Sequence, residues 1–326
     1  MSLGEFDVIA RYFTQPTPAR SDVLLSAGDD CALLKPPEGS LIAVTTDTLV
    51  ENIHFLPTSA ADDVAYKAFM VNLSDIAAMG ATPAWASLAI TLPTINHVWL
   101  STFSQMLFTL LDKYNITLIG GDTTRGPLSI TLTLHGLVPQ AHALTRAGAK
   151  VGDKISVTGT LGDSAAGLAL VLGQKSIANA QQRAFLLQRH RRPEARLAAG
   201  LALSGIASAC IDLSDGLISD LVHILKRSRC GATLALERLP LSAAIKANFS
   251  EQARYKLALS GGEDFELCFT VPPANATALE EVRSRLSLPI TCIGEITAGT
   301  QLVCLQNNQP IDIQWHGFDH FGEENE

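Results

Sequence analysis

The amino-acid sequence predicts an α/β (α+β) protein that consists of two domains. Helix-like and strand-like segments alternate along the chain, which is typical of layered α/β folds. The chain has 326 residues, of which 47% are apolar and 17% charged, enough for two packed cores of ordinary size. Small residues without periodicity occupy 139–151 and indicate a crossing segment. We therefore expect one domain at residues 1–138 and another at 139–326.

The first domain is expected to contain strands at 41–46, 85–92, 116–119 and 129–138, and helices at 60–79 and 97–114. The 129–138 strand has the clearest pattern, because apolar and polar residues alternate from Ile130 to His135. In the second domain we expect strands at 154–158, 207–211, 233–236, 265–271, 291–296 and 302–305, and helices at 163–172, 217–228 and 276–286, with helix-rich sequence up to 203.

Charge and composition exclude several classes of function. The 24 basic and 32 acidic side chains give a formal net charge of -8, which argues against a nucleic-acid partner. The first residues do not have the pattern of a signal peptide, and no apolar run reaches the roughly 18 residues of a membrane helix. The six cysteines are scattered without a Cys-x-x-Cys pair, as in reduced proteins. We expect a cytoplasmic protein that does not bind a membrane.

The chemistry of the sequence lies in acidic residues at the expected ends of strands. The chain has neither a G-x-x-x-x-G-K-[ST] loop nor a G-x-G-x-x-G motif after a strand. The acids at these expected strand ends and turns are Asp29, Asp30, Asp47, Asp75, Asp122, Asp212, Asp215, Glu263 and Asp264. Any one of them taken alone is better explained as a turn or helix-cap residue. Together they predict a carboxylate cluster that needs cations, and Mg²⁺ prefers such oxygen ligands.

Two further features suggest phosphate binding. Residues 159–167 (GTLGDSAAG) connect an expected strand to a helix whose first N–H groups suit an anion. Close packing of a small-residue helix on a sheet explains the same residues equally well. Arg146 lies near the domain junction, where it either clamps a phosphate or is a solvated loop residue.

Seven separated blocks make the chain resemble the thiamine-monophosphate kinase family of the aminoimidazole ribonucleotide synthetase-like superfamily. The blocks are 28–32 (GDDCA), 45–50 (TTDTLV) followed by His54-Phe55, 72–81 (NLSDIAAMGA), 120–124 (GGDTT), 159–167 (GTLGDSAAG), 211–217 (IDLSDGL) and 260–267 (SGGEDFEL). They occur in the family's order over nearly the whole chain. Asn52-Ile53 before His54 and Phe265 are departures from the family's usual residues.

The resemblance implies a two-domain aminoimidazole ribonucleotide synthetase-like fold, in which the N-terminal sheet pairs with that of a second copy in a homodimer and the C-terminal domain is mixed α/β. It implies several Mg²⁺ ions at Asp30, Thr45, Thr46, Asp47, Asp75, Asp122, Asp212 and Asp215. It implies ATP contacts at Gly121, Asp122, Arg146 and Ser214, and substrate contacts at His54, Glu263 and Phe318. The residues match by position in the family's motifs.

The implied activity is ATP-dependent phosphorylation of thiamine monophosphate to thiamine diphosphate, the last step of thiamine diphosphate biosynthesis, by direct in-line transfer with Mg²⁺ and no catalytic group beyond the metal ligands. Alternatives are another ATP-using synthetase of the superfamily, a non-catalytic thiamine diphosphate sensor and a metal-dependent phosphatase. A selenophosphate synthetase would carry a reactive Cys before Cys31, and the chain has none there. A non-catalytic sensor would have less need of six metal-type Asp residues.

Overall fold

The computed structural model describes residues 4–312 of the chain. The chain divides into two compact units, one formed by Met1–Ile76 and Ala81–Ala141, the other by Ala77–Gly80 and His142–Glu326. The change of domain after residue 138 stays a prediction. Within the described residues, no helix is long and apolar enough to cross a membrane.

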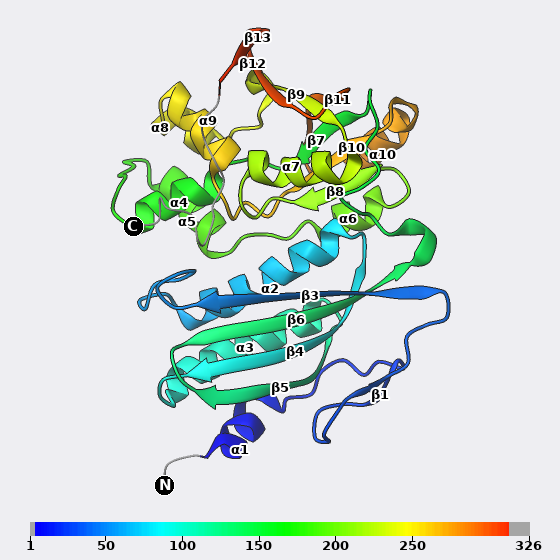
Figure 1. Ribbon diagram of the computed structural model, residues 1–326. Coiled ribbons are helices and arrows are strands. Elements are labelled where there is room, and N and C mark those ends of the chain that lie inside the picture. Colours follow the sequence, from blue (N-terminus) through cyan, green and yellow to red (C-terminus); the bar gives the residue numbers. More distant parts are fainter. Residues whose placement is uncertain (1–3, 313–326) are drawn as a thin grey trace. The chain divides into compact units, whose positions relative to one another are not determined.

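The first unit contains a four-stranded sheet with two long helices on one face (Figure 1). In chain order its elements are α1 (Glu5–Val8), the π-helix η1 (Ile9–Phe13), β1 (Val23–Leu25), β2 (Leu33–Leu34), β3 (Ser40–Val50), α2 (Ala61–Ala78), β4 (Thr82–Leu92), α3 (His97–Lys113), β5 (Thr117–Arg125) and β6 (Ser129–Pro139). The strand order is β3-β6-β4-β5. Strands β4 and β5 pair parallel, whereas β6 pairs antiparallel with β3 and β4.

Alternation along β6 places its apolar residues against the helices. Ile130, Leu132 and Leu134 are buried, whereas the intervening side chains are partly exposed, as the sequence pattern predicts. Helix α3 begins where expected because the Asn96 side chain accepts the N–H groups of Val98 and Trp99.

Two acids that were predicted to follow strands lie inside them instead. Asp47 pairs with Leu132 within β3, and Asp122 pairs with Ala89 within β5. The prediction that these strands end before Asp47 and Asp122 was wrong. It followed the general rule that Asp is rare in strands. Both strands are at the edges of the sheet, so each has one neighbouring strand. At an edge, a polar residue on a strand is tolerated more easily.

The second unit contains a seven-stranded sheet in the order β13-β12-β9-β11-β7-β10-β8. Strands β9 and β12 pair parallel, and the other neighbours pair antiparallel. Its elements are η2 (Gln140–His142, at the boundary), β7 (Lys154–Thr158), α4 (Asp163–Val171), α5 (Ala180–Arg191), α6 (Leu197–Leu203), β8 (Ala209–Asp212), α7 (Leu217–Ser228), β9 (Gly231–Ala235), η3 (Leu236–Arg238), α8 (Ala243–Asn248), α9 (Glu251–Ser260), β10 (Leu267–Val271), η4 (Pro273–Asn275), α10 (Ala276–Leu286), β11 (Ile290–Thr297), β12 (Leu302–Gln306) and β13 (Gln309–Ile311).

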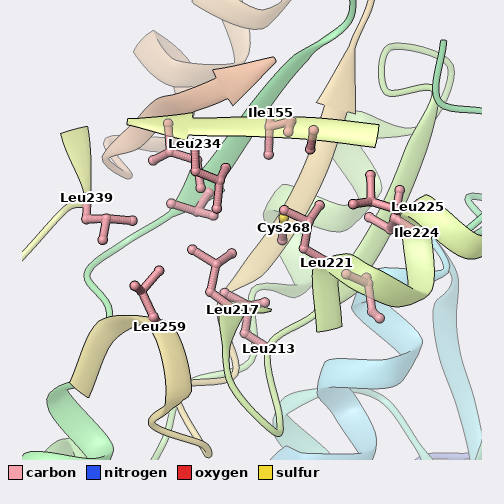
Figure 2. Close-up of a cluster of buried hydrophobic side chains, with 14 of the residues drawn as sticks. Ile155, Leu213, Leu217, Leu221, Ile224, Leu225, Leu234, Leu239, Leu259 and Cys268 are labelled. Atoms are coloured by element: carbon pink, nitrogen blue, oxygen red, sulfur yellow. The ribbon is translucent and has the colours of Figure 1, made fainter. Parts of the chain in front are cut away.

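A core of apolar side chains fixes helix α7 against this sheet (Figure 2). Leu217, Leu221 and Ile224 lie at helical spacing and are buried against Ile155 and Leu234 from the strands. Burying a side chain of this size stabilises the fold by about 1.5–3 kcal/mol. The packing therefore holds the start of α7, and the acidic loop before it, in a fixed place on the sheet.

Candidate functional site

In the first unit, β3 and α2 bring two predicted metal ligands together. Asp47 and Thr45 lie on the face of β3 that turns toward the helices, and Asp75 lies near the end of α2. The Thr45 hydroxyl donates to Asp75 Oδ2. The backbone N–H of Asp47 donates to Asn72 Oδ1, 3.2 Å away, one helical turn before Asp75. This gives a small group of oxygen ligands of the kind that hard divalent cations prefer.

Electrostatics within this group fit a cation. Burial, together with the charge of Asp75, raises the pKa of Asp47 to about 6. Two carboxylates in partial burial repel each other, and a bound cation removes that repulsion. The donor set and its excess negative charge therefore suit Mg²⁺.

We expect Asp47→Asn to abolish a pH-dependent loss of stability in the metal-free protein. The ordinary pKa of Asp, 3.8, is below the folded-state value of about 6, so the folded protein holds the extra proton in between. Its stability therefore falls as pH rises from about 4 to about 6, by roughly 3 kcal/mol at most. Asparagine carries no such proton. Thermal denaturation in EDTA at pH 4 to 8 measures the difference, and parallel profiles for the two proteins would contradict the assignment.

The remaining predicted ligands of the first unit lie apart from this group. Asp122 is at the opposite edge of the sheet from Asp47, and its register places it on the face with Thr131, away from the helices. The Thr46 hydroxyl is on that outer face too, 2.8 Å from Thr133 Oγ1. Asp30 is exposed in the connection between β1 and β2, where its N–H donates to the Asp29 side chain.

Gly121 has a structural role beside its predicted contact with ATP. A Cβ at this position would lie 1.8 Å from the carbonyl oxygen of Leu88 on β4. The close approach of β5 to β4 therefore allows only glycine here. A contact between Gly121 and a nucleotide stays a prediction.

His54 is fixed by a tight turn after β3. Its Nδ1 accepts the Val50 N–H at 3.0 Å, so the ring proton of the neutral imidazole is on Nε2. Asn52 forms the turn with a φ of 69°, which Asn tolerates better than most residues. Lys67 Nζ donates to the His54 carbonyl at 3.3 Å. The orientation of the ring is therefore fixed, and Nε2 is its hydrogen-bond donor.

In the second unit, the loop between β8 and α7 carries three predicted ligands. Asp212 ends β8 and is buried, whereas Ser214 and Asp215 are half-buried. Asp220 in the first turn of α7 stabilises this loop, because its Oδ2 accepts the N–H groups of Asp215 and Gly216 at 3.1 and 3.2 Å. Burial, followed by the charge of Asp215, raises the pKa of Asp220 to about 7.

Asp220 was not among the site residues predicted from the sequence. A signal was present, because an acid in the first turn of the expected 217–228 helix often binds free N–H groups.

Glu263 lies on a segment that is bonded to the same loop. Its N–H donates to the Ser214 carbonyl at 2.7 Å, and the Phe265 N–H donates to the Leu213 carbonyl at 2.9 Å. Glu263 and Phe265 both have positive φ, 65° and 50°. The expected strand at 265–271 therefore begins only at Leu267, because left-handed residues cannot continue a strand ladder.

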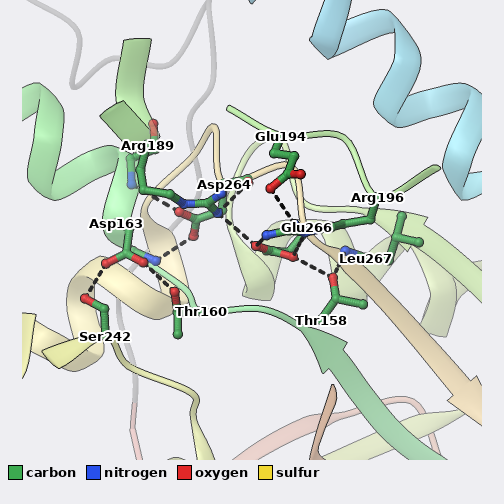
Figure 3. A network of polar contacts seen from close by, with 12 residues as sticks. Thr158, Thr160, Asp163, Arg189, Glu194, Arg196, Ser242, Asp264, Glu266 and Leu267 are labelled. Carbon is green, nitrogen blue, oxygen red and sulfur yellow. Dashed lines mark hydrogen bonds and ion pairs between the residues drawn. The ribbon is translucent and has the colours of Figure 1, made fainter. Parts of the chain in front are cut away.

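The acids that follow Glu263 in the chain belong to a network of buried charges (Figure 3). Glu266 is 0% exposed and binds Arg189 at 2.8 Å, Arg196 Nε at 2.6 Å and the Thr158 hydroxyl at 2.6 Å. A Cβ on Gly159 would collide with the Glu266 carboxylate. The glycine at the start of residues 159–167 therefore makes room for a side chain of the protein itself.

The start of helix α4 is occupied by an internal carboxylate. Asp264 accepts the N–H groups of Gly162 and Ser164, the second at 3.2 Å (Figure 3). Burial is the main cause that raises the pKa of Asp264 to about 7. The Asp163 side chain accepts the hydroxyl groups of Thr160 and Ser242. The first N–H groups of α4 thus bind a carboxylate of the chain itself, and phosphate binding by residues 159–167 stays a prediction.

For two other predicted residues the structure gives few or no contacts. Arg146 is exposed, and its carbonyl accepts the Ser228 hydroxyl at 3.2 Å. Phe318 lies outside the described residues. Among residues 4–312 no group of three or more His, Cys, Asp or Glu is gathered closely enough to hold a metal. The predicted acids occur instead as small sets within each unit, such as Asp47 with Asp75.

Both units match one class of protein. Residues 28–138 match the family model of the AIR synthase related protein N-terminal domain, and residues 150–305 match that of the C-terminal domain. The fold and the acidic loops therefore define an AIR synthase related protein. Hydrogenase maturation protein HypE has the same fold, at a TM-score of 0.73 and 18% identity.

Comparison over the full length defines the family further. The chain is 53% identical to a thiamine-monophosphate kinase of Escherichia coli (strain K12), over 98% of this chain and 99% of that protein. It is 52% identical to the one from Haemophilus influenzae, over 99% of each. The chain belongs to the thiamine-monophosphate kinase family, as the seven blocks predicted.

Solved structures agree with this. The crystal structure of thiamine-monophosphate kinase from Stenotrophomonas maltophilia K279a superimposes with a TM-score of 0.82 at 41% identity, covering 93% of this chain and 97% of that one. The structure of AaThiL complexed with AMPPCP and TMP has a TM-score of 0.77 at 30% identity, covering 98% of this chain and 97% of that one.

Proposed function

We propose that this protein transfers the γ-phosphoryl group of ATP to thiamine monophosphate and releases ADP and thiamine diphosphate. The observation that carries the proposal is the similarity to thiamine-monophosphate kinases at up to 53% identity over 98% of the chain. A related protein has been solved in complex with AMPPCP and TMP, which fits a two-substrate site.

The chemistry requires alignment and charge neutralisation more than acid–base catalysis. A phosphate oxygen of thiamine monophosphate is ionised at neutral pH and attacks the γ-phosphorus, while the bond to the β-bridging oxygen breaks in line. We assign several Mg²⁺ ions to Asp30, Thr45, Thr46, Asp47, Asp75, Asp122, Asp212 and Asp215, where they would neutralise charge between two anionic reactants.

The remaining assignments concern the two substrates. We assign ATP to Gly121, Asp122, Arg146 and Ser214. The substrate's thiazolium is a permanent cation, which suits a carboxylate and an aromatic face, and its pyrimidine edge needs a polar group. Glu263, Phe318 and His54 are our assignments for these three roles. The half-buried Glu263 carboxylate is 29% exposed and so is accessible to a ligand.

Thiamine monophosphate is expected to be phosphorylated and free thiamine is not, because thiamine lacks the anionic nucleophile. The assay follows ADP release from Mg-ATP across a panel of phosphate acceptors, with water as the control that detects a phosphatase. Turnover of thiamine at the same rate would contradict the proposal. ADP release with an amide or selenide acceptor alone would favour another synthetase of the superfamily, and binding of thiamine diphosphate without turnover would favour a sensor.

We place the enzyme in the cytoplasm. All six cysteines are free thiols, and Cys210, Cys230, Cys268 and Cys304 are buried. Free thiols are the usual state of cysteine in a reducing compartment.

We also propose a homodimer that forms through the outer face of the four-stranded sheet. This face carries exposed apolar side chains on β3, of which Val44 is 60% exposed and Ile42 44%. Asp122 and Thr46 lie on the same face, so a second copy would cover predicted ligands as well.

Light scattering at micromolar concentration is expected to give the mass of a dimer, and Val44→Lys is expected to shift it toward a monomer. Val98→Lys is a matched control, because Val98 is an exposed valine on helix α3, away from this face. A wild-type monomer, or equal effects of the two substitutions, would contradict the proposed interface.

A further inference from the structure

The segment that carries Glu263 is held in an unfavourable backbone conformation by its neighbours. Residues 263 and 265 are both left-handed, although neither is glycine. Such a conformation persists only when surrounding contacts fix it, and it is found often at functional sites. The contacts are the two backbone bonds to Ser214 and Leu213 described above, together with the hydrogen bonds of the Asp264 and Glu266 side chains that follow Glu263.

Helix α5 supplies the rest of the support through two consecutive residues. Arg189 donates to the Asp264 carbonyl at 3.3 Å and to Glu266 at 2.8 Å, so it fixes the backbone that follows Glu263. His190 approaches Glu263 itself, because its Nδ1 lies 3.5 Å from Glu263 Oε2. The same Nδ1 lies 3.3 Å from the Ser164 hydroxyl at the start of α4.

Burial distinguishes the two partners. The His190 side chain is 11% exposed and the Glu263 side chain 29%. The imidazole therefore lies on the protein side of the carboxylate, and the carboxylate has the more accessible position. A glutamate has three rotatable side-chain bonds, and a fixed partner removes that freedom before a ligand arrives.

We propose that His190 is a positioning residue that holds the Glu263 carboxylate in the orientation that receives the cationic ring of the substrate. The inference rests on the proposed function and on the assignment of Glu263 to that ring. It adds a residue that the motifs do not contain. His190 acts through Glu263 and has no contact of its own with the reacting phosphates in this proposal.

The Cβ of His190 has a separate, structural role in the packing of two helices. A Cβ on Gly167 would lie 2.7 Å from the His190 Cβ, so α4 and α5 pack closely at this point. Substitutions that keep a Cβ and shorten or reshape the rest leave this packing in place. Asparagine places an amide near the position of Nδ1, glutamine places it near the position of Nε2, and alanine has neither.

The test uses His190→Asn, His190→Gln and His190→Ala in the full chain. We expect alanine and glutamine to raise KM for thiamine monophosphate about 10-fold, with KM for ATP unchanged, because the Glu263 carboxylate loses the polar partner that lies 3.5 Å from its Oε2. We expect asparagine to stay within about 3-fold of the wild type, since an amide at the Nδ1 position restores the partner. A merely structural role would change thermal stability in all three variants and would not separate the two substrates.

A double-mutant cycle with Glu263→Ala tests whether His190 acts through Glu263. We expect His190→Ala to add no further increase in KM when Glu263 is already alanine. An additive increase, an equal rise in KM for ATP, or no effect of His190→Ala and His190→Gln would overturn the inference. If the wild-type protein does not phosphorylate thiamine monophosphate at all, the proposed function fails first. Normal wild-type turnover with unaffected His190 variants removes only the inference.

Discussion

Asp75→Asn is expected to lower turnover at least about 100-fold while the fold stays intact. Substitution of a residue that only hydrogen-bonds to a metal ligand typically lowers metal affinity or activity about 10–100-fold. Substitution of a ligand itself is expected to lower activity by at least as much. Asp75 is also the acceptor of the Thr45 hydroxyl, and its charge adds to burial, the main cause that raises the pKa of Asp47. Without divalent metal, the substitution removes repulsion, so thermal stability is expected to hold or rise.

The measurements are kcat with Mg-ATP and thermal unfolding in EDTA. We expect the same loss for Asp30→Asn and Asp122→Asn. Asp112→Asn is the matched control, because Asp112 is an exposed acid near the end of α3 in the same unit. Near-normal turnover in all three site variants would mean that these acids are ordinary structural residues and not ligands.

Arg196→Ala is expected to destabilise the second unit by up to about 3–5 kcal/mol, the cost of leaving a buried charge without its partner. Its guanidinium binds both oxygens of Glu266, which is 0% exposed. Removal of one partner leaves a buried charge with less compensation, and this costs far more than the pair itself contributes. Arg189 and Thr158 remain as partners, so the loss is expected to be partial rather than a collapse of the network.

The same arginine provides its own control. Glu194 also binds Arg196, at 2.9 Å, but its side chain is 64% exposed. Glu194→Gln is expected to cost less than about 1 kcal/mol, because water screens an exposed ion pair. Urea unfolding followed by circular dichroism compares the two variants. Equal costs would mean that burial does not govern the strength of this network.

Much of the fold could be predicted because local patterns and tertiary packing agree. The strand at 154–158 and the helices at 217–228 and 276–286 have the predicted bounds. The short helices α8 and α9 were missed, since their apolar faces are narrow and interrupted by polar residues. Strands β1 and β2 are too short to show an alternating pattern.

The candidate site could be predicted only for residues that lie in recognisable motifs. The acids at 47, 75, 212 and 215 carry a recognisable local sequence. His190, by contrast, lies in a helix with no special composition, 73 residues before Glu263, and only the packing of α4, α5 and the 261–267 segment brings the two together. Sequence spacing alone contains no information about such a contact, because it depends on how distant elements are placed.

The backbone bonds between residues 213–214 and 263–265 link two loops that have different tasks in the proposed reaction. Ser214 and Leu213 belong to the acidic loop, and each accepts an N–H from the segment that carries Glu263. A displacement of one loop therefore displaces the other. If metal and nucleotide bind the loop between β8 and α7, as we propose, they would also stabilise the segment that carries Glu263, and a substrate bound at Glu263 would stabilise the loop by the same free energy, since thermodynamic linkage is reciprocal.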